Sequence, residues 1–135
     1  MSQPVEGSAD DWLARADEDL LVAVLLLSHG LFNSAAYHCQ QCAEKAVKAL
    51  LVEYGVRPSK THDLDELVYA CRKVGAEFGP DLIDAALVLT PFAMVSRYPG
   101  WGHVSASQAE HAVALSRQFR AEVARLLASR ASGVQ

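Results

Sequence analysis

Hydrophobic residues recur at intervals of three and four along most of the chain, which is the spacing of an amphipathic α-helix. No segment alternates apolar and polar residues as a half-buried strand would. The segments of helical period are separated by residues that commonly start or stop helices. The pattern therefore predicts an all-α fold, an antiparallel bundle of about five helices.

The first two predicted helices have recognisable starts. The first begins near Ser8, whose capping-box partner is Asp11, and ends near Gly30. The second begins with Asn33 or Ser34 as its cap. Each has an apolar stripe that we expect to be buried: Leu13, Ala16, Leu20, Ala23 and Leu27 in the first, and Ala36, Cys39, Ala43, Val47 and Leu50 in the second.

Two helix faces lie outside these stripes. From Leu20 onward the first helix is apolar on all sides, so one face can pack in the core and the other suggests contact with a second chain. On the second helix, Gln40, Glu44 and Lys48 follow one another at i, i+4 spacing. We expect this second face to be a solvated flank.

The third and fourth helices are shorter. The third begins at Asp63, which we expect to form a capping box with Glu66, and ends near Val74. The fourth begins at Pro80 and should bend at Pro91, because a proline ring removes a backbone donor and clashes with the preceding turn. Its apolar residues are Leu82, Ile83, Leu87, Leu89, Phe92 and Met94.

The last helix begins at Ser105, with Gln108 as its capping partner. Its apolar stripe is Ala112, Leu115, Phe119, Val123 and Leu126. We expect it to fray after Ala128. The predicted domain therefore covers residues 8–129, with residues 1–7 and 130–135 as flexible termini.

Composition restricts the class of protein. With 135 residues, 51% of them hydrophobic and 21% charged, the chain can form one globular domain with a real core. A net charge of −4 argues against sequence-independent coating of nucleic acid, but it allows a small local anion site. The N-terminus lacks a signal-peptide pattern, and the longest apolar run, residues 20–27, is too short to span a membrane. We expect a cytoplasmic protein.

The cysteines have a spacing that could indicate redox chemistry or zinc. Cys39 and Cys42 are separated by two residues, His38 adjoins them, and Cys71 is the third cysteine. However, the pair lies inside a strong helical pattern with no second ligand pair at metal spacing. We therefore interpret both as small buried side chains one turn apart, and assign no metal and no cofactor.

The connection between the last two helices, residues 97–103, collects unusual chemistry. His103 lies just before the last helix, whose first N–H groups and dipole attract anions. Arg97 presents a guanidinium fork suited to a phosphate. Tyr98 and Trp101 offer rings on which a base could stack. These four residues predict a site for a nucleotide or an RNA phosphate.

The same loop could cleave RNA without a metal. RNA carries its own nucleophile, the 2′-hydroxyl, and His103 could remove its proton or protonate the leaving oxygen. Arg97 could stabilise the charge that develops on the phosphoryl oxygens. The structural alternative is that Arg97 binds carbonyls or an acidic neighbour, that Trp101 fills a gap between helices, and that His103 is an exposed loop residue.

Four segments, in their order along the chain, resemble the successive signatures of the HEPN domain family. They are the segment from Asp11-Trp12-Leu13 to Leu21, AAYHCQQCAEKAVKALL at 35–51, KTHDL at 60–64 and RYP at 97–99. The resemblance covers about residues 12–127. It implies an antiparallel helical bundle that is usually a homodimer and, in prokaryotes, is often encoded beside a minimal nucleotidyltransferase.

The resemblance also implies candidate activities. Many members of the family are metal-independent ribonucleases, often toxins, with an Arg followed by a His after four to six intervening positions. Arg97 and His103 have this spacing, although Tyr98 stands where Asn, Asp or His is usual. Ser105 stands where a subgroup of toxins paired with nucleotidyltransferases has a modified Tyr. The Arg-Tyr-Pro subgroup, which the chain resembles most, is proposed to bind nucleotides or other substrates.

The sequence is compatible with three functions. In the first, a homodimer binds a nucleotide or RNA phosphate in an interface cleft and acts with a minimal nucleotidyltransferase in a toxin–antitoxin-like module of two genes. In the second, the protein is a metal-independent endoribonuclease toxin whose catalytic residues are Arg97 and His103. In the third, it is a non-catalytic docking subunit.

Further polar candidates lie outside the loop. We expect His62 to bond to a neighbouring helix while Asp63 caps the third helix. Gln41, Glu44 and Lys45, on the second helix, are candidates to extend the ligand cleft.

Overall fold

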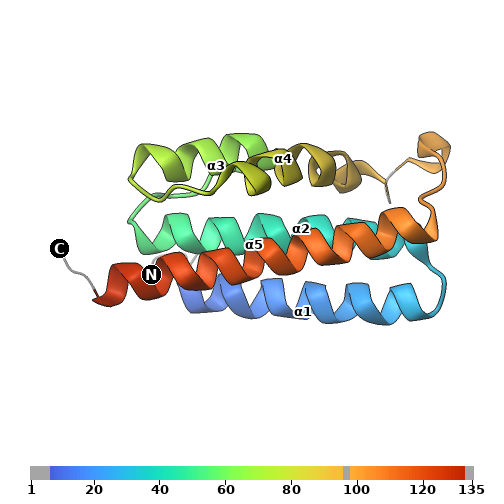
Figure 1. The fold of residues 1–135 in the computed structure, drawn as a ribbon, viewed down its shortest axis with the longest axis horizontal. Coiled ribbons are helices and arrows are strands. Elements are labelled where there is room, and N and C mark those ends of the chain that lie inside the picture. The colour runs from blue at the N-terminus through green and yellow to red at the C-terminus, as the bar shows by residue number, and fades with distance from the viewer. Residues whose placement is uncertain (1–6, 96–97, 133–135) are drawn as a thin grey trace, which may run out of the picture.

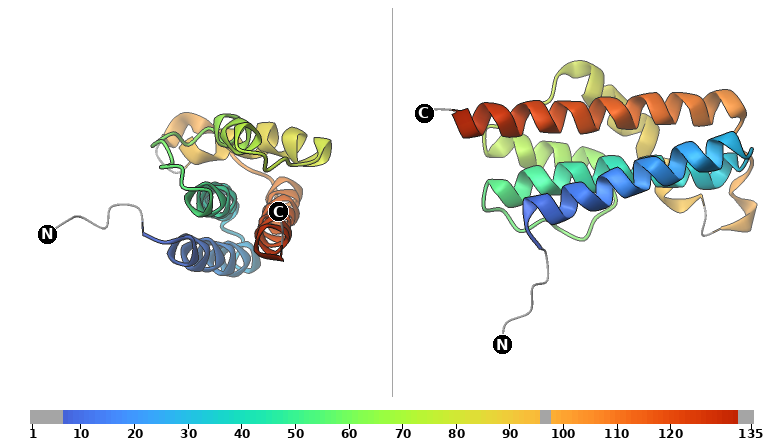
Figure 2. Two further views of the ribbon diagram at one scale, coloured as in Figure 1. Left: turned by 90° about the vertical axis from the view of Figure 1, so that its left-hand side faces the viewer. Right: turned by 90° about the horizontal axis from the view of Figure 1, so that it is seen from below.

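The computed structural model describes residues 7–95 and 98–132, apart from the side chain of Trp101, and is an all-α bundle (Figure 1). The three long helices are α1 (Ala9–Ser28), α2 (Phe32–Glu53) and α5 (Ala106–Ser132). The shorter α3 (Leu64–Lys73) and α4 (Pro80–Leu89) form a second layer across them. Seen along the bundle, α2 lies between α1 and the α3–α4 layer and contacts both, as well as α5 (Figure 2).

The predicted capping box at the start of α1 is confirmed. The Ser8 side chain accepts the Asp11 N–H at 3.1 Å, and the Asp11 carboxylate accepts the Ser8 N–H at 3.0 Å. The residues predicted to form the α2 stripe are completely buried, and in α1 Ala16 and Ala23 are buried while the leucines of the stripe pack at the edge of the core. Local signals in the sequence were therefore sufficient to predict where α1 begins and which face of α2 is buried.

The predicted start of α2 is wrong. Leu31 stands at the N-cap without a side-chain hydrogen bond, and both Asn33 and Ser34 lie inside the helix. The side chain of Asn33 bonds instead to the connection before α5. The side-chain amide that we expected to cap α2 therefore forms its hydrogen bonds with a backbone segment that is distant in sequence.

The polar flank of α2 also differs from the prediction. Gln40 is fully buried, and Glu44 and Lys48 are only 4% and 6% exposed. Their polar groups bind one another and His62, which lies in the connection between α2 and α3. Burial is tolerated because the charges are paired within the network.

The α3–α4 layer is held together by side-chain caps. Asp63 caps α3 by accepting the N–H of Asp65 at 2.9 Å, not through the predicted box with Glu66. The Thr90 hydroxyl accepts the N–H of Leu64 at 3.1 Å and donates to the carbonyl of Ala86 at 2.8 Å, which joins the start of α3 to the end of α4.

Pro91 changes the course of the chain after α4, as its geometry predicts. The α-helix ends at Leu89 and continues as a short 3₁₀-helix, η1 (Thr90–Met94). Only one side of the apolar fourth segment is buried. Of the residues predicted there, this side carries Leu82, Leu89 and Phe92. The others predicted there, Ile83, Leu87 and Met94, remain exposed to solvent in this single chain.

The last helix is longer than predicted. Ser105 and Gln108 form the expected reciprocal capping box, with hydrogen bonds of 2.8 and 3.1 Å. α5 is helical to Ser132, past Ala128, after which we expected the helix to fray. The Arg130 guanidinium lies 4.0 Å from the centre of the Tyr54 ring, a cation–π contact that attaches this end of α5 to α2.

Part of the apolar surface of α1 is exposed to solvent. Leu21 and Leu25 on α1 are 60% and 53% exposed, so the second apolar face that the sequence predicted on this helix is present and uncovered in the single chain. Among the described helices, none is both long and apolar enough to cross a membrane.

Candidate functional site

The predicted loop lies at the end of the bundle where α1 turns into α2 (Figure 1). Arg97, one of the two proposed catalytic residues, lies outside the described residues, as does the side chain of Trp101. Tyr98 is 56% exposed and precedes a single 3₁₀ turn, η2 (Pro99–Trp101). His103 is exposed. The structure therefore presents two of the four predicted side chains to solvent within the same connection.

The backbone on either side of His103 is fixed from α2. The side-chain amide of Asn33 donates to the Gly102 carbonyl and accepts the Val104 N–H, each at 2.8 Å. Gly102 has φ +111°, a conformation that side-chain-bearing residues rarely adopt. The Val104 side chain is buried. His103 is therefore an exposed side chain on a restrained stretch of chain.

The start of α5 offers fewer free donors than its sequence suggested. The N–H of Gln108 binds the Ser105 hydroxyl, and the N–H of Val104 binds Asn33. By helix geometry the N–H groups of Ala106 and Ser107 have no acceptor within α5 itself, and they lie at the positive end of the helix dipole. An anion could approach there beside His103.

A second polar cluster centres on Glu44. Its Oε1 accepts from Gln40 Nε2 at 3.1 Å and from His62 Nδ1 at 2.9 Å, and its Oε2 accepts from Lys48 Nζ at 2.8 Å. Burial raises the pKa of Glu44, but the hydrogen bonds from Lys48 and His62, with the charge of Lys48, outweigh it and hold the pKa below its usual value. Glu44 is thus an ionised structural hub.

The expectation for His62 is confirmed, since it bonds to α2 through Glu44. The other candidates for extending the cleft are also engaged within the fold. Gln41 donates to the Gln40 side chain at 2.7 Å, and Lys45 donates to Asp19 at 2.7 Å. These contacts hold α1, α2 and the α2–α3 connection together, which is a structural role.

Asp19 was missed at the sequence level. It is a buried carboxylate that bonds to Lys45 and to His38 Nδ1, the latter at 2.8 Å. The available signal was its position, because Asp19 interrupts the apolar side of the first helix between Ala16 and Ala23. A charged residue there requires a partner, although the pattern does not say which.

The cysteines are structural, as the helical pattern predicted. All three are buried and unpaired in the fold. Burial raises the pKa of Cys39 to about 11 and those of Cys42 and Cys71 to about 12. They are therefore neutral thiols near pH 7, whereas nucleophilic and metal-binding cysteines are thiolates.

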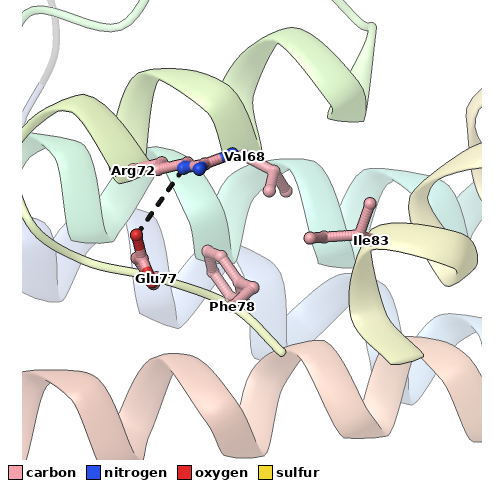
Figure 3. Close-up of a pocket in the computed structure, with 5 residues that line it drawn as sticks. All are labelled: Val68, Arg72, Glu77, Phe78 and Ile83. Atoms are coloured by element: carbon pink, nitrogen blue, oxygen red, sulfur yellow. Dashed lines mark ion pairs between the residues drawn. The ribbon is translucent and has the colours of Figure 1, made fainter. Parts of the chain in front are cut away.

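A pocket of about 230 Å³ lies elsewhere, between α3 and α4 (Figure 3). Its apolar lining comes from Val68, Phe78 and Ile83, and an ion pair between Arg72 and Glu77, 3.6 Å apart, lies at its side. Both charged side chains are largely exposed, so the pair adds little stability. None of the residues that line this pocket belongs to the predicted site.

The family can now be assigned, because the model of the HEPN domain matches residues 9–126, nearly the whole chain. The chain belongs to the HEPN domain family. This HEPN domain also resembles solved structures along most of its length. The structure of TT1696 from Thermus thermophilus superposes with a TM-score of 0.79 at 28% identity, over 87% of this chain and 97% of that one.

The chain is also similar to two further proteins. The structure described as ST0689, an archaeal HEPN homologue, superposes with a TM-score of 0.71 at 25% identity, over 88% of this chain and 98% of that one. A 45-residue stretch is 49% identical to a protein of Methanocaldococcus jannaschii named "Putative toxin MJ1304". That stretch spans 33% of this chain and only 30% of the relative.

Proposed function

We propose that this HEPN domain forms a homodimer that binds a nucleotide or an RNA phosphate through the loop of residues 97–103. It acts with a minimal nucleotidyltransferase in a toxin–antitoxin-like pair of genes. The observation that carries the proposal is the presentation of His103 on a restrained backbone beside the positive end of α5. Exposed polar groups on a fixed loop are typical of binding sites.

The ligand class follows from the chemistry of the loop. Free N–H groups at a helix start and an imidazole suit an anionic oxygen, and Arg97 adds a permanent positive charge. Tyr98, more than half exposed, offers a ring face for a base. A phosphate joined to a base satisfies both features, and the acidic chain as a whole disfavours long nucleic-acid contacts.

The proposed dimer is supported by uncovered apolar surface. Leu21 and Leu25 follow one another on the outer side of α1, and both are more than half exposed. Contiguous exposed leucines on a bundle commonly mark a contact with another chain. A dimer would supply a second copy of the loop, so that two imidazoles could serve one ligand.

Binding can be tested by calorimetric titration of the full chain with ATP and with a mixed-sequence single-stranded RNA. We expect His103→Ala and Arg97→Ala each to weaken binding about tenfold or more. Matched controls are His111→Ala and Arg72→Ala, which remove exposed groups outside the loop and should leave affinity within about twofold. No binding of either ligand by the parent protein would refute the proposal.

A second candidate is a metal-independent ribonuclease toxin that uses Arg97 and His103. The similarity of one stretch to a protein named as a toxin favours it. In this case, induction of the parent protein arrests growth and the arrest disappears in His103→Ala, whereas His111→Ala keeps it. Equal growth with the parent and His103→Ala, at equal protein levels, would exclude this activity.

The docking-subunit alternative predicts a different dependence on the loop. Complex formation with a co-expressed nucleotidyltransferase would then be insensitive to substitution of Arg97, Tyr98, Trp101 and His103, and no ligand would bind. Co-purification of the complex from cells that express both proteins, for the parent and for each variant, separates this outcome from the first proposal.

A further inference from the structure

Asn33 makes long-range hydrogen bonds to both residues that flank His103. Its Nδ2 donates to the carbonyl of Gly102, and its Oδ1 accepts the N–H of Val104, both at 2.8 Å. A carboxamide is suited to this task because it carries a donor and an acceptor on one rigid planar group. One side chain of α2 thereby restrains the chain immediately before and immediately after the imidazole.

Because it forms these two hydrogen bonds, the Asn33 side chain does not cap its own helix. Asn33 lies near the start of α2, where an asparagine commonly caps the helix, yet Leu31 at the N-cap has no side-chain partner. The amide is therefore used for the α4–α5 connection in place of its own helix. We interpret this choice of partner as a sign that the conformation of the α4–α5 connection is more important to the protein than a side-chain cap on α2.

Neighbouring features fix the same segment. Gly102 adopts φ +111° and ψ −169°, which a residue with a Cβ adopts only under strain, and a Cβ added there would meet no other atom within 4 Å. Val104 is buried, whereas His103 between them is exposed. The restraint therefore acts on backbone direction, and the imidazole itself stays accessible.

We infer that Asn33 is a positioning residue for His103, holding the imidazole in the orientation in which it meets a phosphate beside the start of α5. The inference rests on the proposed function of the loop. Asn33 does not contact the ligand in this arrangement. It acts by limiting the conformations of residues 102–104, so that the loop does not lose that freedom when the ligand binds.

Asn33→Ala removes both hydrogen bonds, and Asn33→Asp keeps the acceptor for Val104 while losing the donor to Gly102. We expect Asn33→Ala to lower affinity for ATP and RNA about tenfold, and Asn33→Asp to lower it at least as much, because its second carboxylate oxygen would face the Gly102 carbonyl and its charge would repel the anionic ligand. Asp17→Ala is the matched control, because Asp17 also makes two long-range hydrogen bonds, to Arg120 on α5. It should change affinity less than about twofold.

A double-mutant cycle separates positioning from simple stabilisation. If Asn33 acts through His103, Asn33→Ala has little further effect on affinity in a His103→Ala background, so the two changes are not additive. If Asn33 only strengthens the fold, the affinity loss is the same in both backgrounds. Additive losses would overturn the inference.

Amide hydrogen exchange gives a readout that needs no ligand. In the parent protein the N–H of Val104 should be protected, and Asn33→Ala should abolish that protection and shift the NMR signals of the His103 ring, while α1 and α2 amides stay protected. Unchanged Val104 exchange or ring signals in Asn33→Ala would overturn the inference. If the parent binds neither ATP nor RNA, the proposed function fails, and these exchange and ring signals still decide whether Asn33 positions His103.

Gly102→Ala tests the same segment independently of α2. It should lower affinity in the parent background because an alanine at positive φ strains residues 102–104. It should have little effect once His103 is replaced. An affinity equal to that of the parent would argue against a need for this backbone conformation.

Discussion

At the residue scale, the most consequential group outside the loop is Glu44. It is almost fully buried, and it accepts hydrogen bonds from Gln40, Lys48 and His62. Removing one partner of a buried ion pair leaves the other charge desolvated, which is more damaging than losing both. The network is therefore a stability determinant that the i, i+4 spacing alone did not reveal.

Glu44→Ala should destabilise the protein by about 3 kcal/mol, because Lys48 is left buried without its carboxylate. Urea unfolding at about pH 7, followed by circular dichroism, measures the change. Glu53→Ala is the control on the same helix, because Glu53 is exposed, and it should change stability by less than about 0.5 kcal/mol. A similar effect of both substitutions would contradict a buried hub.

The same network gives a pH dependence with a definite sign. The folded-state pKa of Glu44 is below its usual value of 4.5, so its ionised form stabilises the fold above that pH, and this contribution is lost as the pH falls through the folded pKa. The stability difference between the parent and Glu44→Gln should therefore shrink as the pH falls into the range below 4.5. A difference that stays constant across this range would show that the carboxylate charge is not involved.

The cysteines allow a chemical test at the same scale. With raised pKa values and buried sulfur atoms, Cys39, Cys42 and Cys71 should react with a thiol reagent such as DTNB only after unfolding in urea. Fast reaction of a native thiol near pH 7 would indicate an exposed thiolate and contradict the structural assignment.

At the element scale, side-chain caps stabilise the starts of α1, α3 and α5. The reciprocal hydrogen bonds of Ser105 and Gln108 satisfy the backbone N–H groups of both residues at the start of α5, next to the candidate site. Ser105→Ala should cost about 1 kcal/mol in stability, measured by thermal or urea unfolding. Ser129→Ala, an exposed serine far along α5, should be nearly neutral. Equal effects would show that the cap contributes no special stability.

The elements themselves were largely predictable. Period, caps and glycines gave the position of each helix, and Pro91 gave the change after α4, because these signals act over a few residues. Two of the errors have a common cause. Asn33 does not cap α2 but forms hydrogen bonds with Gly102 and Val104. α5 continues to Ser132, and Arg130 near its end packs on the ring of Tyr54. In both cases a tertiary contact outweighed a local preference.

At the scale of the whole molecule, the proposed homodimer requires a surface that a second copy of the chain covers. The proposed homodimer should bury the face of α1 that carries Leu21 and Leu25. Leu25→Asp should then shift the protein from dimer to monomer in sedimentation experiments, because a carboxylate cannot be buried there unpaired. Leu87→Asp, a matched change at an exposed leucine on α4, should leave the dimer intact. A monomeric parent would refute the dimer, and dissociation by Leu87→Asp alone would move the interface to α4.

The sequence by itself determined the number and order of the helices, most of their caps, the apolar stripe of α2 and the family, because each depends on local spacing or on a pattern along the chain. It also directed attention to His103 and Tyr98, which the fold leaves exposed. Only the tertiary structure decided that Glu44 is a buried hub, that Asp19 has partners and that Asn33 holds the loop. Those roles depend on groups that are distant in sequence and adjacent only after the helices pack, so no local pattern could encode them.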